Sequence, residues 1–323
     1  MVQTSIAEQA IIAEVRRHAP AGRDVQVGIG DDAAVTRPPE GCDLLTVTDA
    51  LVAGTHFEPA APAYSVGYRA LAVNLSDIAA LGGEPLWASL ALSVPEYDSD
   101  WIEQFGAGFG GLATAHDVAL IGGDTVRGPL QAAVTVQGWV PRGTAVLRSG
   151  AAVGDLVCVT GFPGDAAAGR FLLEGRIHSA AGEADYLRGR FQYPQPRCSA
   201  GRELRGLATA MIDVSDGLDI DLRRLLDASG VGAQLDVSRL RCSSALLNAC
   251  GRKDALGCAL VGGEDYELAF TVTPRHAPEI AALAERLELP VAMLGKVTGA
   301  TEVVWTDDGQ PYQMPLGRFE HFQ

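Results

Sequence analysis

The 323-residue sequence lacks several features that mark common classes of protein. No apolar run approaches the roughly 20 residues that a membrane-spanning helix needs, so we expect no membrane partner. The six cysteines form no C-x-x-C pair and the first residues show no signal-peptide pattern, which favours a reducing cytoplasm. Basic residues number 25 against 40 acidic ones, with no basic run, so we expect no nucleic-acid partner.

The usual nucleotide and hydrolase motifs are also missing. GIGDDAAV (residues 28–35) lacks the third glycine of G-x-G-x-x-G, and no G-x-x-x-x-G-K-[ST] loop occurs. The histidines form no H-E-x-x-H, and Ser215 lies in DVSDG rather than in G-x-S-x-G. A dinucleotide fold, a P-loop enzyme, a zinc hydrolase and an α/β-hydrolase therefore receive no support.

What is present indicates a compact protein of two domains. Hydrophobic residues make up 47% and charged residues 20%, as in ordinary globular chains, and the length is about twice that of a usual domain. Around PRGTAVLRSGAAVGDLVCVTG the pattern changes from strands to a charged, glycine-rich loop. We therefore place the domains at residues 1–150 and 151–323.

Both halves mix strands and helices, which predicts an α+β or mixed α/β fold. Apolar runs bounded by turn residues predict strands at 25–30, 43–52, 85–94, 118–126, 130–140, 156–160, 208–214, 233–237, 258–262 and 266–273. Helical periodicity predicts helices at 5–18, 64–83, 101–115, 164–174, 198–207, 217–229 and 277–287.

Aspartates stand repeatedly where these elements meet loops. Mg²⁺ prefers oxygen ligands, commonly carboxylates together with substrate phosphates, so carboxylates converging from several loops would suit Mg²⁺ ions on a polyphosphate. Taken singly, each one is better explained as a turn residue or a helix cap, but the whole set is not, because turns do not need apolar strands immediately before them. The set is Asp31, Asp32, Asp49, Asp77, Asp124, Asp213, Asp216 and Asp265.

Seven segments together resemble the thiamine-monophosphate kinase family in order and spacing. They run from about residue 25 to the C-terminus and include GIGDDAAV, TDALVAGTHF, GYRALAVNLSDIAALGG, IGGDTVRG, RSGAAVGD, IDVSDGL and GGEDYEL. The resemblance implies the two-domain fold of aminoimidazole ribonucleotide synthetase. It further implies that the N-terminal sheet pairs with its twin in a homodimer.

The resemblance also implies a reaction and a set of site residues. ATP, as co-substrate, would phosphorylate thiamine monophosphate to thiamine diphosphate by direct in-line transfer with several Mg²⁺ ions. The implied metal ligands are Asp32, Thr48, Asp49, Asp77, Asp124, Asp213 and Asp216. The implied ATP contacts are Gly123, Asp124, Arg148 and Ser215, and the implied substrate contacts are His56, Glu264 and Phe319.

Structural explanations remain open for three of these residues: Arg148 as a surface residue, His56 as a packed loop histidine and Phe319 as a core plug. The rival functions are other ATP-dependent enzymes of the superfamily, or a binding protein without catalysis. The hydrogenase-maturation dehydratase would be expected to carry a C-terminal cysteine, whereas this sequence ends RFEHFQ. Selenophosphate synthetase would be expected to show a reactive cysteine in an N-terminal glycine-rich segment, and the first cysteine here is Cys42.

Overall fold

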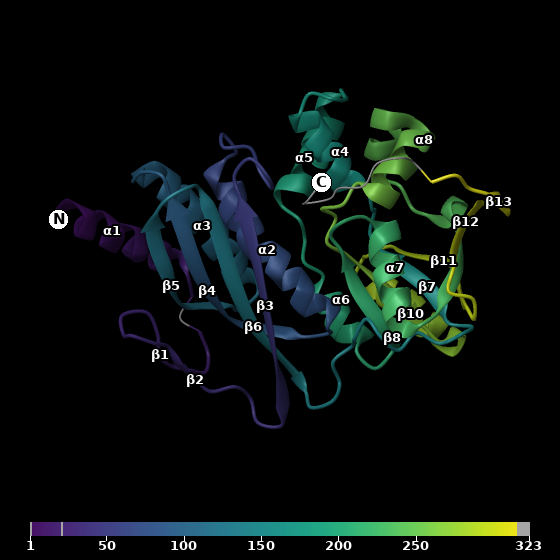
Figure 1. The fold of residues 1–323 in the computed structure, drawn as a ribbon, viewed down its shortest axis with the longest axis horizontal. Helices are drawn as coiled ribbons and strands as arrows, with labels where there is room; N and C mark the ends of the chain where they lie inside the picture. Colours follow the sequence, from purple (N-terminus) through teal and green to yellow (C-terminus); the bar gives the residue numbers. More distant parts are fainter. Residues whose placement is uncertain (1, 21, 315–323) are drawn as a thin grey trace. The chain divides into compact units, whose positions relative to one another are not determined.

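The computed structural model describes residues 2–20 and 22–314, and side chains from residue 7 onward (Figure 1). The chain forms two compact units. The first comprises residues 1–78 and 83–143, and the second comprises residues 79–82 and 144–323. No helix in the described part of the chain is both long and apolar enough to cross a membrane.

A four-stranded sheet organises the first unit, in the order β3-β6-β4-β5. β3 and β4 are each antiparallel to β6, whereas β5 is parallel to β4. A short β1-β2 ribbon precedes this sheet. The strand bounds are β1 Val25–Val27, β2 Val35–Thr36, β3 Cys42–Val52, β4 Glu84–Val94, β5 Ala119–Arg127 and β6 Gln131–Pro141.

Three helices accompany this sheet: α1 (Val2–His18), α2 (Ala63–Ala80) and α3 (Ser99–Ala115). The buried residues of β6 alternate with half-buried ones, so one face of the sheet packs against helix side chains such as Ile78 of α2. Glycines let α2 and α3 approach closely: a Cβ at Gly108 would lie 2.0 Å from the carbonyl oxygen of Tyr64. α3 begins at its N-cap Asp98, which accepts from the amides of Asp100 and Trp101.

The second unit contains a seven-stranded sheet in the order β13-β12-β9-β11-β7-β10-β8. Its pairs are antiparallel except for β12 with β9. The bounds are β7 Leu156–Thr160, β8 Ala208–Val214, β9 Gly232–Asp236, β10 Glu267–Val272, β11 Val291–Thr298, β12 Val303–Asp307 and β13 Gln310–Pro311.

The described residues of this unit also form six α-helices and two 3₁₀ turns. α7 lies beside β7, β8 and β10 (Figure 1). Its buried face, including Leu222 and Leu226, belongs to the same apolar cluster as these strands. The bounds are α4 Asp165–Leu173, α5 Ala181–Gln192, α6 Cys198–Leu204, α7 Leu218–Ser229, α8 Ser244–Val261 and α9 Ala277–Arg286, with η1 Val237–Arg239 and η2 Pro274–His276.

The mixed α/β prediction is confirmed, but one predicted strand is wrong. Residues 258–262 belong mainly to the end of α8, because the short apolar run there fits a buried helix as well as a strand. Ser243 is the N-cap of this helix, and its hydroxyl oxygen accepts from the amide of Leu246. The sequence prediction also missed α5, most of α8, β11 and β12.

Candidate functional site

A cavity of about 450 Å³ in the first unit gathers one group of the predicted site residues. Asp32, Gly123 and Asp124 line it, together with apolar residues of α1 such as Ile12. Asp32 and Asp124 are both exposed to solvent. The Asp124 carboxylate accepts a hydrogen bond from the amide of the next residue, Thr125, at 2.9 Å. These carboxylates are therefore accessible from the cavity, as a ligand-binding group must be.

Gly123 takes a backbone conformation that other residues rarely adopt. Its φ is +147°, and a Cβ there would lie 1.8 Å from the carbonyl oxygen of Leu90 on β4. The register of β4 and β5 shifts just before this point, between Ala88 and Ser89. Only glycine lets β5 pass this close to β4, and the bare backbone beside Asp124 leaves room for a bulky anion.

A second group of predicted residues lies at the opposite edge of the same sheet. The Asp49 amide on β3 donates to the side-chain oxygen of Asn74 at 3.0 Å. Asp77 lies three residues after Asn74 in α2, on the same side of the helix. Thr48 points to the other face of β3, where its hydroxyl contacts that of Thr135 at 2.8 Å.

His56 follows β3 and is tied into its own loop. The Val52 amide donates to His56 Nδ1 at 3.0 Å, so the neutral ring carries its proton on Nε2. Arg69 of α2 donates to the carbonyl oxygen of His56 at 2.9 Å. The structure thus gives this histidine a loop-closing role.

One copy of the sheet keeps these two groups apart. The register aligns Asp49 with Val134, Val134 with Leu90, and Leu90 with Gly123. β3 and β5 are three strand spacings apart, which is about 14 Å. In the described residues, no three His, Cys, Asp or Glu side chains gather closely enough to hold a metal ion. The first unit of a single chain therefore does not bring together the carboxylates that the sequence analysis expects to converge.

In the second unit, the IDVSDGL segment turns from β8 into α7 around a buried carboxylate. Asp221 Oδ2 accepts from the amides of Ser215, Asp216 and Gly217 at 3.0, 3.0 and 3.2 Å. Arg224 donates to both Asp216 and Asp221, at 2.6 and 2.7 Å. Burial raises the pKa of Asp221 to about 6, although these donors favour its ionised form.

Three predicted residues in this loop thus differ in what they can offer a ligand. Asp213 is buried near the end of β8, opposite Leu268 of β10. Asp216 is half-buried and already paired with Arg224. Ser215 is held by its amide and also by its carbonyl oxygen, which accepts from the Glu264 amide at 2.7 Å.

The GGED segment packs directly on this loop. Gly263 has a φ of +70°, and a Cβ there would lie 2.6 Å from the Ser215 carbonyl oxygen. Glu264 itself has a φ of 67°, and its carboxylate accepts from the Tyr266 hydroxyl at 3.2 Å. The structure therefore brings Ser215 and Glu264 side by side from segments about 50 residues apart.

The same segment also carries two buried acids with structural contacts. Asp265 accepts from the amides of Gly164 and Ala166 at the start of α4, and burial raises its pKa. Glu267 accepts from Arg190 at 2.8 Å and also pairs with Arg197. Burial alone would raise the pKa of Glu267, but Arg197 and Arg190 outweigh it and lower the pKa. All six residues of β10 are buried, and the sequence pattern of this strand gave no sign of the ion pair.

The last two predicted residues are Arg148 and Phe319. Arg148 is exposed, and its carbonyl oxygen accepts from the Ser229 hydroxyl at 3.1 Å. Its guanidinium remains a candidate for a phosphate contact. Phe319 lies outside the described residues.

Two family models match the chain. The AIR synthase related protein, N-terminal domain, matches residues 30–140, and the corresponding C-terminal domain matches residues 152–308. The chain is also 44% identical, over 93% of each chain, to thiamine-monophosphate kinase of Escherichia coli K12.

Two solved structures agree with these matches. Thiamine-monophosphate kinase from Stenotrophomonas maltophilia is 43% identical with a TM-score of 0.87, covering 94% of this chain and 97% of that one. AaThiL, solved in complex with AMPPCP and TMP, is 31% identical with a TM-score of 0.77, covering 91% and 92%. The chain therefore belongs to the thiamine-monophosphate kinases, within the AIR synthase related family.

Proposed function

We propose that the chain transfers the γ-phosphoryl group of ATP to thiamine monophosphate, forming thiamine diphosphate. The observation that carries this proposal is the 44% identity to a thiamine-monophosphate kinase along 93% of both chains. The relative solved with an ATP analogue and TMP supports the same pair of substrates. The acceptor is a phosphate monoester, which is largely ionised near pH 7, so its oxygen needs no general base.

The first unit offers the donors that Mg²⁺ prefers. Asp32 and Asp124 present carboxylate oxygens at one cavity, with no nitrogen or sulfur ligand among the lining residues that would favour zinc. We propose that these two, with Asp49 and Asp77, hold Mg²⁺ ions, and that Thr48 assists. Bound Mg²⁺ would neutralise phosphate charge between two polyanionic substrates.

The second unit supplies the polar loops that surround β8. Asp213 would be a further metal ligand, whereas Asp216 serves first to hold the loop through Arg224. Ser215 and the exposed guanidinium of Arg148 would contact ATP, as would the backbone at Gly123 in the first unit. Catalysis would then rest on positioning and charge neutralisation rather than on a covalent intermediate.

The thiamine end of the acceptor has a cationic thiazolium ring and a flat pyrimidine. We propose that Glu264 contacts the cation, since its carboxylate is half-buried and oriented by Tyr266. His56 and Phe319 complete this proposed set of substrate contacts. We also propose a cytoplasmic enzyme, since six cysteines without a C-x-x-C pair favour a reducing compartment.

A homodimer would resolve the separation of the two acidic groups. β3 and β5 are the two edges of the sheet in the described chain, and each carries a half-exposed apolar residue, Leu44 on β3 and Val126 on β5. Long edge strands of this kind favour pairing with another strand. If β3 of one copy meets β5 of its twin, Asp49 and Asp77 approach the partner's Asp32 and Asp124.

The reaction is tested by supplying ATP and Mg²⁺ with thiamine monophosphate, free thiamine or an aminoimidazole ribonucleotide precursor in parallel. Of the three acceptors, only thiamine monophosphate should yield thiamine diphosphate. Chromatography detects this product, and ADP release is measured in parallel. ADP release with another acceptor, and no thiamine diphosphate, would refute the proposal.

The shared site is tested by mixing two inactive variants, Asp49→Asn and Asp124→Asn, under conditions that exchange subunits. A mixed dimer would carry both changes in one site and none in the other. Activity should therefore return to about a quarter of the unmodified level in an equal mixture. No recovery, with mixed dimers demonstrated by differently tagged copies, would mean that each copy builds its site alone.

A further inference from the structure

The segment of residues 262–266 carries two non-glycine residues in the left-handed backbone region. Glu264 has a φ of 67° and Tyr266 a φ of 51°. A positive φ is uncommon outside glycine, and for a bulky residue such as tyrosine it is an outlier that the surrounding structure must enforce. Backbone strain of this kind gathers at functional sites, so the contacts that hold this segment indicate what it does.

The end of β8 holds one side of the segment. The Glu264 amide donates to the carbonyl oxygen of Ser215 at 2.7 Å, and the Tyr266 amide donates to that of Val214 at 2.8 Å. Two hydrogen bonds to consecutive carbonyl groups fix both strained residues against the same short stretch of backbone.

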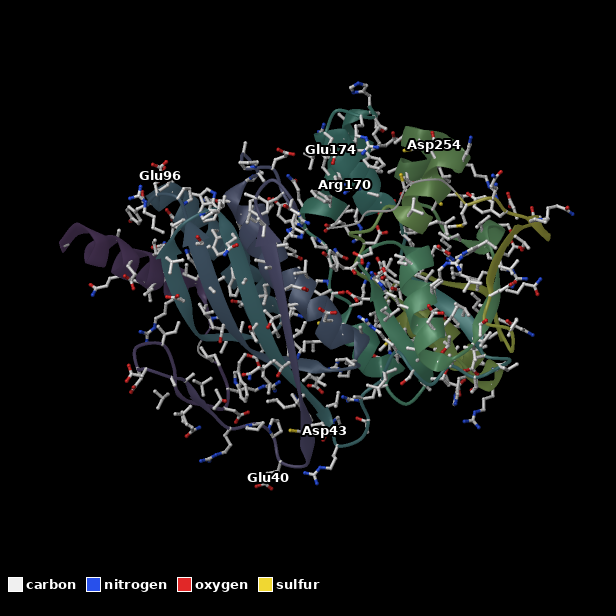
Figure 2. All side chains as sticks on the ribbon, in the orientation of Figure 1. Glu40, Asp43, Glu96, Arg170, Glu174 and Asp254 are labelled. Carbon is white, nitrogen blue, oxygen red and sulfur yellow. The ribbon has the colours of Figure 1, made fainter. Side chains whose placement is uncertain are left out.

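α4 holds the other side of the segment. Its N-cap, Gly164, has no side chain to cap the helix, and the buried Asp265 carboxylate takes this role. Asp265 accepts from the amides of Gly164 and Ala166 at 2.8 and 3.3 Å. Further along α4, Arg170 (Figure 2) donates to the Gly262 carbonyl oxygen at 3.5 Å. The backbone around Glu264 is thus tied to a helix as well as to a strand.

This backbone brings the side chains of Glu264 and Tyr266 together, whereas that of Asp265 between them turns to α4. The buried Tyr266 donates its hydroxyl hydrogen bond to Glu264 Oε2 at 3.2 Å. A glutamate side chain loses rotamer freedom when its carboxylate binds a ligand, which weakens binding. A hydrogen bond from a rigid, buried ring removes part of that loss, because it orders the carboxylate beforehand.

We propose that Tyr266 is a positioning residue that sets the affinity for the acceptor substrate through Glu264. This role rests on the proposed function, in which the Glu264 carboxylate contacts the cationic ring of thiamine monophosphate. The ring takes no part in the phosphoryl transfer, so this contact is equally strong in the ground state and in the transition state. Such a contact lowers KM and leaves kcat unchanged.

The experiment measures steady-state kinetics of Tyr266→Phe in the full chain with ATP and Mg²⁺. KM for thiamine monophosphate should rise about tenfold, as loss of one hydrogen bond to a charged group produces. The kcat and the KM for ATP should stay within about twofold of the unmodified chain, and thermal unfolding checks that the variant is folded. An unchanged KM for thiamine monophosphate would overturn the proposal.

The matched control is Tyr186→Phe, which also removes a bond from a tyrosine hydroxyl to a carboxylate in the second unit. Tyr186 of α5 donates to Asp165 at 2.7 Å, and its loss should leave both KM values within about twofold. An equal rise in the KM for thiamine monophosphate in the two variants would mean general loosening of the unit and would contradict a role through Glu264.

A double-mutant cycle tests whether Tyr266 acts through Glu264. In a Glu264→Ala background, Tyr266→Phe should change KM by less than about twofold, because no carboxylate remains to be oriented. A full tenfold effect in that background would overturn the proposal. If the unmodified chain forms no thiamine diphosphate, the proposed function fails and this role fails with it. Turnover by the unmodified chain, with an unchanged KM in Tyr266→Phe, refutes the positioning role alone.

Discussion

The two units use their acidic side chains in opposite ways. In the first unit, Asp32 and Asp124 belong to exposed residues that line a cavity. In the second unit, Asp265 and Glu267 are buried and receive donors from backbone amides or arginines. The neighbouring donors, rather than the motif, therefore decide whether an aspartate or glutamate is available to a metal ion or holds the fold together.

The largest expected effect tests the structural half of this comparison. Glu267→Gln leaves Arg190 and Arg197 facing a neutral group in a buried site, which should reduce the free energy of unfolding by about 3–5 kcal/mol. Denaturant unfolding measures it. The matched control is Asp307→Asn, which breaks an exposed pair with Arg252 and should change stability little. Equal effects of the two changes would contradict this account.

The next effect tests the available carboxylates of the first unit. Asp49→Asn and Asp124→Asn should each lower turnover about 10²–10³-fold, as loss of one electrostatic contact in an active site does, with an unchanged unfolding midpoint. Turnover is measured over a wide range of Mg²⁺ concentration. Asp100→Asn, on the exposed start of α3, is the control and should retain full activity. Near-normal rates for both variants would remove the metal proposal.

A smaller effect concerns the backbone beside Asp124. Gly123→Ala should cost about 1–3 kcal/mol of stability, because the residue has a positive φ and a Cβ would collide with the Leu90 carbonyl oxygen. Gly122→Ala is its matched control, since a Cβ at that position meets nothing within 4 Å. Thermal unfolding of the two variants compares them directly. If both lose the same stability, the close approach of β4 and β5 does not require glycine.

The smallest effect is a pH dependence that separates the two buried acids. The pKa of Asp265 is raised in the folded chain, so its stabilising contribution is present below its ordinary pKa of 3.8 and is lost as pH rises through the folded value. Asp265→Asn should remove that loss, at up to about 1.4 kcal/mol for each pH unit.

Glu267 should show the opposite sign. Its pKa is lowered, so its contribution is present above its ordinary value of 4.5 and is lost as pH falls through the folded value. As pH rises, Asp265→Asn should therefore become more stable relative to the unmodified chain, whereas Glu267→Gln should become less stable relative to it. Parallel pH profiles for both variants would contradict these shifts.

Local sequence patterns predicted much of the secondary structure. β7 and β8 have the predicted bounds, because their buried apolar runs are short and bounded by turn residues. α8 was missed because its polar residues and Gly251 interrupt the helical period, and packing against α4 and α5 helps to stabilise it. Helices of this kind depend on tertiary contacts more than on local preference.

The candidate site was predictable in part. The glycines and aspartates of GIGDDAAV and IGGDTVRG identified the residues around the first-unit cavity, since exposed carboxylates beside bare backbone suit a phosphate ligand with Mg²⁺. The sequence did not reveal that Asp216 is paired with Arg224, eight residues away. It also did not separate Asp265, which caps α4, from Glu264 beside it.

The sequence by itself determined the family, the mixed α/β fold and which acidic segments to consider, because periodicity and motif spacing are local properties of the chain. The tertiary structure alone decided how those acids are used. Strand order separates Asp49 from Asp124, and burial beside arginines or helix amides commits Glu267 and Asp265 to the fold. Burial and hydrogen-bond partners come from residues far apart in the chain, so no local pattern could encode them.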